Sequence, residues 1–319
     1  MGQGRQHRPG LNPDQLRMAN GLAMIGIRVS ALRICMPLVV IGTLSCSLVH
    51  AQSASQPAGP EVRVNLEAPQ PQAAGDVGAL AEKLQNPIAD LISIPFQSNT
   101  NFNVGPHDSA QDILNIQPVI PIHIGDGWNV ITRTIIPLTW SPSYQPLASV
   151  PPFGLGLTSF SAFLSPSKTI DGWTWGAGPI FGLPTITDKF LGSNVWGAGP
   201  AVVAVRTAPP WVYGLLINNL FSLGGTAGRG GTSYSVMTIN PFVNYNFGGG
   251  WFVGAVPIVT ASWDTAGEKW TLPVGIQGGR LIKVRGKLPV NLLVGAYYNV
   301  LRPSAAGTWQ LRTQIALIF

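Results

Sequence analysis

Side chains that commonly carry catalysis are sparse in this chain beyond residue 51. Cys35 and Cys46 both precede that point, and the histidines that follow it are His107 and His123. No zinc-binding HExxH pair, GxSxG nucleophile turn or GKS/GKT phosphate loop occurs in the sequence. The glycine-rich stretch GGTAGRGG at 224–231 lacks the strand–loop–helix context of a phosphate site. We therefore predict that the protein is not an enzyme, and we assign it no catalytic residue, metal site or cofactor.

Charge is also scarce. Charged residues make up 10% of the chain, against about 25% in typical soluble domains. The net charge of +6 arises largely near the start, because five of the basic residues lie within the first 33 positions. From residue 52 onward the chain has 14 basic and 12 acidic residues. This balance predicts no nucleic-acid partner.

The first 51 residues have the order of a secretory signal peptide. Arg28 and Arg33 precede the apolar run ICMPLVVIGTLSCSLV, and the small residue Ala51 ends the segment. We predict cleavage after Ala51, with translation starting at Met1, Met18 or Met24. A transmembrane anchor and a lipid-modified Cys46 are weaker alternatives, the first because the run is short for a span of about 20 residues.

Two short segments lead into the rest of the chain. Residues 52–75 are rich in Ala, Gln and Pro and predict a flexible periplasmic arm. Apolar residues at helical spacing then predict a short helix over 76–91, which Pro87 ends or kinks.

From residue 92 to 319 the apolar residues alternate with a period of two. Twelve segments of about a dozen residues can be delimited, and a tilted strand of about 9–11 residues crosses a bilayer. Short turns such as 125–127, 209–210 and 248–250 alternate with longer loops such as 141–154 and 224–232. This alternation is typical of outer-membrane barrels, in which the short turns face the periplasm. We predict an all-β, antiparallel, up-and-down transmembrane barrel of about 12 strands after the short N-terminal helix.

Tryptophans recur at the ends of these segments. The indole ring favours the headgroup region, where its ring lies in lipid and its N–H in water. The terminal Phe319 joins them, which explains why an apolar alternation runs to the last residue. The predicted membrane-interface aromatics are Trp128, Trp140, Trp173, Trp196, Trp211, Trp251, Trp263, Trp270, Trp309 and Phe319.

If the apolar face of each strand meets lipid, the opposite face lines the lumen. Amides dominate that face, which favours small neutral or amphipathic solutes over a strongly charged filter. Amides that satisfy one another could equally plug a closed barrel, and the helix at 76–91 could enter the lumen or lie flat on the membrane. The predicted lumen-lining residues are Gln97, Asn99, Asn101, Asn103, Asn115, Gln117, His123, Arg133, Asn218, Asn240, Asn244, Gln277, Asn291, Asn299, Gln310, Arg312 and Gln314.

Three other architectures fit less well. A secreted soluble sandwich or propeller leaves the low charge and the tryptophan positions unexplained. A helical membrane protein conflicts with the Pro or Gly that interrupts nearly every apolar segment. A barrel-embedded lipase requires a Ser–His pair on the lipid face, whereas His123 is predicted to face the lumen.

The stretch LQNPIADLISIPFQSNTNFNVGP (84–106) resembles the start of a family of Gram-negative outer-membrane proteins. LNIQPVIPI (114–122), GWNVITRTIIPL (127–138), the two WGAGP repeats and the terminal Phe are similar to the same family. Its members are labelled transporters, are related to the meta-pathway phenol-degradation family and are sometimes mislabelled neuromedin U. The resemblance implies an outer-membrane barrel that takes up small compounds, aromatic ones among the candidates, and it carries no established catalytic residues.

We predict an outer-membrane channel or transporter that contacts lipid and passes or binds a small neutral or aromatic solute. The alternative is a structural or surface-binding barrel with a plugged lumen that uses the loops at 141–154 and 224–232. The identity of the solute and the oligomeric state stay open.

Overall fold

A computed structural model describes residues 72–142, 152–224 and 232–319 of the chain. Within them, helix α1 (Gln72–Leu84) precedes fifteen β-strands, and the short 3-10 helix η2 (Lys189–Leu191) lies between β7 and β8. The strands are β1 (Ser93–Val104), β2 (Ser109–Ile116), β3 (Val119–Ile124), β4 (Trp128–Trp140), β5 (Phe153–Leu155), β6 (Thr158–Pro166), β7 (Trp173–Leu183), β8 (Gly197–Ala208), β9 (Trp211–Ser222), β10 (Ser235–Gly248), β11 (Trp251–Ala255), β12 (Val259–Ser262), β13 (Trp270–Val284), β14 (Leu288–Leu301) and β15 (Trp309–Ile318).

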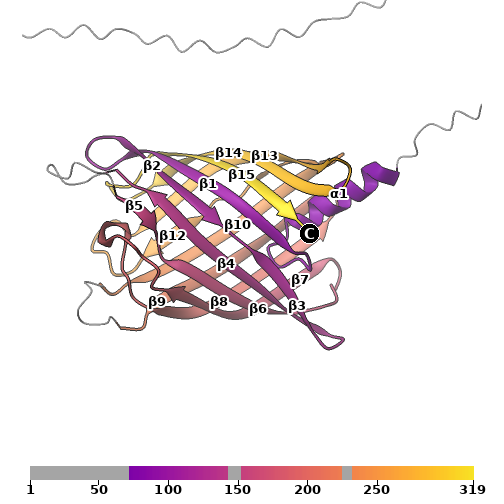
Figure 1. The fold of residues 1–319 in the computed structure, drawn as a ribbon, viewed down its shortest axis with the longest axis horizontal. Coiled ribbons are helices and arrows are strands. Elements are labelled where there is room, and N and C mark those ends of the chain that lie inside the picture. Colours follow the sequence, from indigo (N-terminus) through magenta and orange to yellow (C-terminus); the bar gives the residue numbers. More distant parts are fainter. Residues whose placement is uncertain (1–71, 143–151, 225–231) are drawn as a thin grey trace, which may run out of the picture. The chain divides into compact units, whose positions relative to one another are not determined.

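The strands form one closed antiparallel barrel (Figure 1). Three pairs of short strands, β2 with β3, β5 with β6 and β11 with β12, are halves of single wall strands, so the wall has 12 strands. The last strand pairs with the first from Ser93↔Ile318 to Phe102↔Trp309 and closes the wall. The predicted 12-strand barrel with a preceding short helix is therefore confirmed.

The two ends of the barrel differ in their connections. Ser93 and Ile318, at the start and finish of the wall, lie at one end together with the turns at 125–127, 209–210 and 285–287. We call this the turn end. At the opposite end lie the last residue of β4 and the first of β5, and the last residue of β9 and the first of β10, and we call it the loop end. Much of the two loops predicted to bind partners lies outside the described residues.

Prolines within the wall coincide with interruptions of the strand pairing. Pro118 separates β2 from β3, Pro257 separates β11 from β12, and Pro273 follows a register shift against β14. Pro179 and Pro200, which occupy matching places in the two WGAGP repeats, face each other across β7 and β8. Because proline has no N–H to donate, these breaks and bulges accommodate it in a wall without a free edge.

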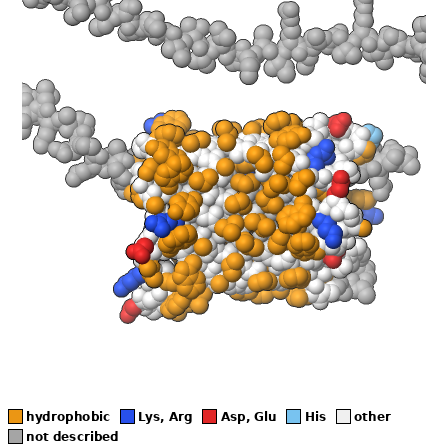
Figure 2. Space-filling model, turned by 180° about the vertical axis from the view of Figure 1, so that it is seen from behind, with side chains coloured by type: hydrophobic (Ala, Val, Ile, Leu, Met, Phe, Trp, Pro, Cys, Tyr) orange, Lys and Arg blue, Asp and Glu red, His pale blue; other side chains and the backbone are white. Residues whose placement is uncertain are grey.

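The exterior carries a continuous apolar surface. Figure 2 shows hydrophobic side chains across the middle of the wall, with charged side chains confined to its two edges. Ile276 on β13, Val294 on β14 and Ile315 on β15 are 68%, 55% and 52% exposed. So much exposed apolar surface is incompatible with water as the surrounding solvent. The wall is that of a membrane-spanning barrel, in which the backbone groups are satisfied within the protein rather than by lipid.

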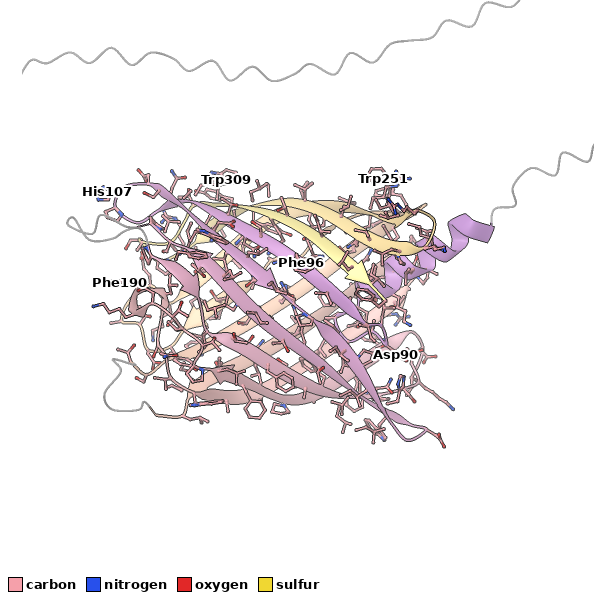
Figure 3. The ribbon with its side chains drawn as sticks, in the orientation of Figure 1. Asp90, Phe96, His107, Phe190, Trp251 and Trp309 are labelled. Atoms are coloured by element: carbon pink, nitrogen blue, oxygen red, sulfur yellow. The ribbon has the colours of Figure 1, made fainter. Side chains whose placement is uncertain are left out.

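The predicted interface aromatics lie at both rims, and each of them is at least 37% exposed. Trp251 and Trp309 mark opposite ends in Figure 3, with Phe96 between them. Ring contacts link aromatics within each rim: Trp211–Tyr245 at the turn end, and Trp263–Trp270 and Tyr298–Trp309 at the loop end. Trp175, which was not predicted at an interface, packs against Trp128 with 6.1 Å between ring centroids.

Helix α1 lies earlier in the chain than the predicted 76–91. It covers Gln72–Leu84 and ends three residues before Pro87. Asn86 turns the chain, because its side-chain oxygen accepts a hydrogen bond of 3.0 Å from the backbone N–H of Ile88. No helix in the described residues is long and apolar enough to cross a membrane. The predicted signal peptide and most of the arm lie outside the described residues and stay predictions.

A charge added to the lipid face of the wall should destabilise the barrel more than a charge added to its interior face. Ile276→Lys places a cation on the lipid face near the middle of β13 and should lower the free energy of unfolding by about 2–4 kcal/mol. Thr238→Lys, at an interior position of β10, should cost less than Ile276→Lys, because its side chain extends into a cavity rather than into lipid. Denaturant titration in phospholipid vesicles measures both, and equal losses would contradict the assignment of faces.

Candidate functional site

The barrel interior has two chemically different walls. Strands β4 and β6–β10 contribute a buried apolar cluster that includes Ile131, Phe163, Val203, Leu216 and Phe242. Strands β1, β2 and β13–β15 contribute amides and one arginine instead. The interior is therefore amphipathic around its circumference.

Arg312 is the centre of the polar wall and is only 2% exposed. Its Nη1 donates to the backbone oxygen of Val256 at 2.8 Å, and its Nε donates to Asn99 Oδ1 at 3.2 Å. The guanidinium also lies over the Tyr297 ring, 4.5 Å from the centroid, and the Tyr297 hydroxyl donates to Gln277 Oε1 at 2.9 Å. Neutral groups alone satisfy this buried cation among the described residues, which makes it a structural centre.

A ladder of amides extends from Arg312 toward the loop end. Arg312 Nη2 donates to Gln310 Oε1, Gln310 Nε2 to Asn101 Oδ1, and Asn101 Nδ2 to Gln111 Oε1, at 3.1–3.3 Å. Gln111 Nε2 then donates to Ser141 Oγ at 3.1 Å. Each amide is oriented by its neighbours, so the wall presents a fixed pattern of donors and acceptors.

Three cavities of about 240, 380 and 470 Å³ occupy the interior. The first lies toward the turn end between the two walls, the second follows the polar wall toward the loop end, and the third follows the apolar wall. Ile258 lines all three, and Arg133 and Asn240 line both the first and the third. The three spaces therefore meet around one level of the barrel.

The interruption at Val256–Ile258 forms this meeting point. Its backbone leaves the ladder between β11 and β12, and two side chains from other strands bind its carbonyl oxygens. Arg312 Nη1 donates to Val256 O, and Asn240 Nδ2 donates to Pro257 O at 2.7 Å. Because both carbonyls are bound, Ile258 is held at a fixed position between the cavities.

Arg133 differs from Arg312. It lies on β4 where the two walls meet, and its Nη2 donates to Gln117 Oε1 at 2.8 Å. No other hydrogen bond or ion pair of Arg133 is found within the described part of the chain. A guanidinium has five N–H donors, so most of its capacity faces the cavities.

The segment after helix α1 fills the turn end of the interior. Ile88 is 2% exposed and packs in the apolar cluster with Phe163 and Val205. Gln85 and Asn246 exchange two amide hydrogen bonds of 2.7 and 3.3 Å. We call residues 85–91 the plug segment. The sequence predicted a helix that either enters the lumen or lies flat on the membrane, and it did not predict that the non-helical residues after the helix fill the interior.

The helix itself docks on the opposite side of the turn end. Ala81 packs with Leu281 and Ile318, and Val77, Leu80, Leu84 and Leu91 surround this contact. Partial burial raises the pKa of the Glu82 carboxyl above its usual range. Docking is therefore favoured at acidic pH, where Glu82 is protonated, and that preference is lost as pH rises through the raised pKa.

A hydrogen-bonded pair of side chains lies at the rim beside the plug segment. Asp90 Oδ2 is 3.0 Å from His123 Nε2, and both side chains are largely exposed. Figure 3 shows Asp90 at the turn end, far from His107. Throughout the described ranges, no three His, Cys, Asp or Glu side chains are grouped so that they could hold a metal ion.

Most of the predicted lumen residues line the cavities. Those on the first cavity are Gln97, Asn115, Gln117, Arg133, Asn240, Asn244, Gln277, Asn291, Arg312 and Gln314; Asn218 lines the third; Asn101, Asn299 and Gln310 line the second. Asn99 is buried in the Arg312 network. Two lie elsewhere: His123 is at the rim, and Asn103 is exposed with a φ of 59° where β1 shifts register, so Val104 lines the second cavity instead.

Sequence reasoning missed the apolar half of the interior and the plug residue Ile88. On β8 the interior positions are Ala201, Val203 and Val205, while Val202 faces outward and is 48% exposed. Both faces of such a strand are apolar, so alternation cannot distinguish them. The near absence of polar residues on β7–β9 is the signal that was available.

Comparisons with known proteins find solved outer-membrane proteins that resemble this structure. An outer membrane channel from Pseudomonas putida F1 matches with a TM-score of 0.53 and 14% identity, over 72% of this chain and 96% of that one. The NanC porin (TM-score 0.44, 9% identity) matches 72% of this chain and 98% of its own. Outer membrane phospholipase A from Escherichia coli (TM-score 0.38, 12% identity) matches 72% and 96%. The likeness to the Pseudomonas channel shows a shared fold.

No family model matches the chain, and no curated protein matches it. The resemblance to the phenol-degradation family and the absence of catalysis therefore stay predictions.

The two interior arginines should differ in their effect on stability. Arg312→Gln removes several hydrogen bonds to a buried cation and should lower the free energy of unfolding by about 2–3 kcal/mol. Arg133→Gln removes one hydrogen bond at a half-buried position that borders two cavities and should cost about 1 kcal/mol or less. Chemical unfolding in detergent micelles compares them, and a larger loss for Arg133→Gln would contradict the assigned roles.

Proposed function

We propose that the protein is a channel of the Gram-negative outer membrane that passes small amphipathic solutes by diffusion, with its turn end in the periplasm. Adjoining cavities carry the proposal, because Ile258 lines all three and Arg133 and Asn240 each line two of them. In the channel proposal, a solute passes from one cavity to the next by moving past these shared side chains.

The two walls indicate the kind of solute. One wall offers amides in a fixed ladder, and the other offers Ile, Leu and Val side chains. Asn244 and Asn291 line the first cavity, and their buried Oδ1 atoms have no donor among the described groups. Buried acceptors are normally satisfied, so these two amides can accept a donor from water or from a solute in the first cavity. A molecule with one apolar and one polar side fits such an interior better than a sugar or an inorganic ion.

Membrane location is supported by the exterior rather than by the interior. The exposed apolar wall, the two aromatic rims and the barrel shared with an outer membrane channel agree with one another. Arg206 and Arg280 lie over Trp173 and Trp251 at the turn end, at 5.7 and 4.9 Å from the ring centroids. Such arginines extend to the headgroup layer of a bilayer. The predicted signal peptide supplies the export that this location requires.

The plug segment favours a second candidate, a closed barrel that serves as a scaffold. Ile88 in the apolar cluster and the Gln85–Asn246 amide pair close the turn end in this state. In the channel proposal, the same contacts are a closed state that opens when the segment leaves. The two proposals therefore differ in whether loosening the segment creates a pathway.

Conductance of the full chain in planar bilayers tests this difference. Ile88→Ser removes the buried anchor of the plug segment and should raise the mean conductance several-fold over the unaltered protein. Ile92→Ser is the matched control, because Ile92 is 42% exposed and outside the apolar cluster, and it should leave conductance unchanged. A folded barrel that conducts no ions with either Ile or Ser at position 88 would overturn the channel proposal and favour the scaffold.

A further inference from the structure

The charges that face the interior are unbalanced. Arg133 lines the first and third cavities and Arg312 lines the first, and no Asp or Glu lines any of the three in the described part of the chain. Among the described acidic groups, Glu82 and Asp90 line a separate cavity at the turn-end rim, and Asp112 accepts hydrogen bonds from Ser98 and Thr100. Two cations in a low-dielectric enclosure without a counter-charge create a field that attracts anions.

Of the two cations, Arg133 is the one available to a ligand. Arg312 uses its donors on Asn99, Val256 and Gln310 and stacks on Tyr297. Arg133 donates only to Gln117, and the amide nitrogen of Gln117 has no acceptor among the described residues. A guanidinium beside a free amide donor matches the two oxygens of one carboxylate, and charge-assisted bonds of this kind are the strong ones.

An apolar space adjoins this cation. The third cavity, of about 470 Å³, is lined by Arg133 at its border and by Ile180, Leu216, Leu220 and Val236 along its side. That volume lies within the range of small-molecule sites, which combine an apolar lining with a few placed polar groups. It accommodates a single aromatic ring or a branched alkyl chain.

We propose that Arg133 and the third cavity form a binding site for an amphipathic monocarboxylate, whose carboxylate contacts Arg133 and whose apolar body lies against Leu216 and Val236. The site deepens the proposed function, because a solute on the channel path is what reaches it. One available guanidinium and the apolar lining favour one negative charge, since a phosphate or a dicarboxylate would bury charge without a partner.

Equilibrium binding of sodium benzoate to the purified full chain in detergent micelles tests the site without requiring conduction. Isothermal calorimetry at pH 7 should show saturable binding of benzoate. Benzamide, which has the same shape without the charge, should bind at least tenfold more weakly. Acetate, which lacks the apolar body, should show no saturation in the range that saturates benzoate.

Two substitutions assign the binding to named side chains. Arg133→Gln keeps an amide donor but removes the charge, and it should weaken benzoate at least tenfold while leaving benzamide unchanged. Val236→Thr keeps the volume but adds a hydroxyl to the apolar lining, and it should weaken benzoate and benzamide by a similar factor. Heat-modifiable migration on a gel shows that each variant forms a closed barrel.

The results separate this inference from the channel proposal. Benzoate binding that Arg133→Gln weakens supports the site, even if no variant conducts. Equal binding of benzoate and benzamide, or benzoate affinity unchanged by Arg133→Gln in a folded barrel, overturns it. Conductance opened by Ile88→Ser would still stand in that case, and only the assigned solute class would fall.

Discussion

The structure depends on one constraint: in lipid, every backbone N–H and C=O of the wall must find a partner within the wall. Pairing of β15 with β1 removes the last free edge, and the exterior can then be almost wholly apolar. Proline cannot donate to the ladder, so it occupies interruptions such as Pro118 and Pro257. The second of these interruptions brings Ile258 to the place where the interior cavities meet. The same constraint that closes the wall thus shapes the space inside it.

The interior is polar on one side and apolar on the other, and each side has its own means of stability. On the polar side, Arg312 ties β15 to Asn99 on β1 and to the backbone of Val256. On the apolar side, Phe163, Val203 and Leu216 pack as in the core of a soluble protein. Ile88, which belongs to the plug segment and not to a strand, completes that core inside the barrel. The plug segment is therefore part of the folded barrel rather than an appendage to it. An interior with one polar and one apolar side favours amphipathic solutes.

The number of strands and the placement of tryptophans at strand ends could be derived from the sequence, because alternation and turn length follow the strands. The alternation delimits segments at 128–140 and 288–301, and these are the bounds of β4 and β14. The polar half of the interior could also be predicted, since Asn, Gln and Arg312 occupy every second position over much of β1 and β15. The apolar half was not, because alternation carries no information where both faces of a strand are apolar. Ile88 and Ile258 were out of reach for another reason: their roles arise from contacts with strands far away in the chain.

The central claim is that lipid surrounds the wall and that the opposite face of each strand looks into an enclosed interior. Leu292 and Leu293 on β14 test it most directly, because the two have the same side chain, with Leu292 40% exposed on the outside and Leu293 lining the first cavity. No cysteine follows Cys46, so a spin label can be placed at either position in turn. In lipid vesicles, the label at 292 should relax strongly with oxygen, which dissolves in acyl chains, and the label at 293 should show low oxygen access and a more polar surrounding. Equal oxygen access at the two positions would contradict the account.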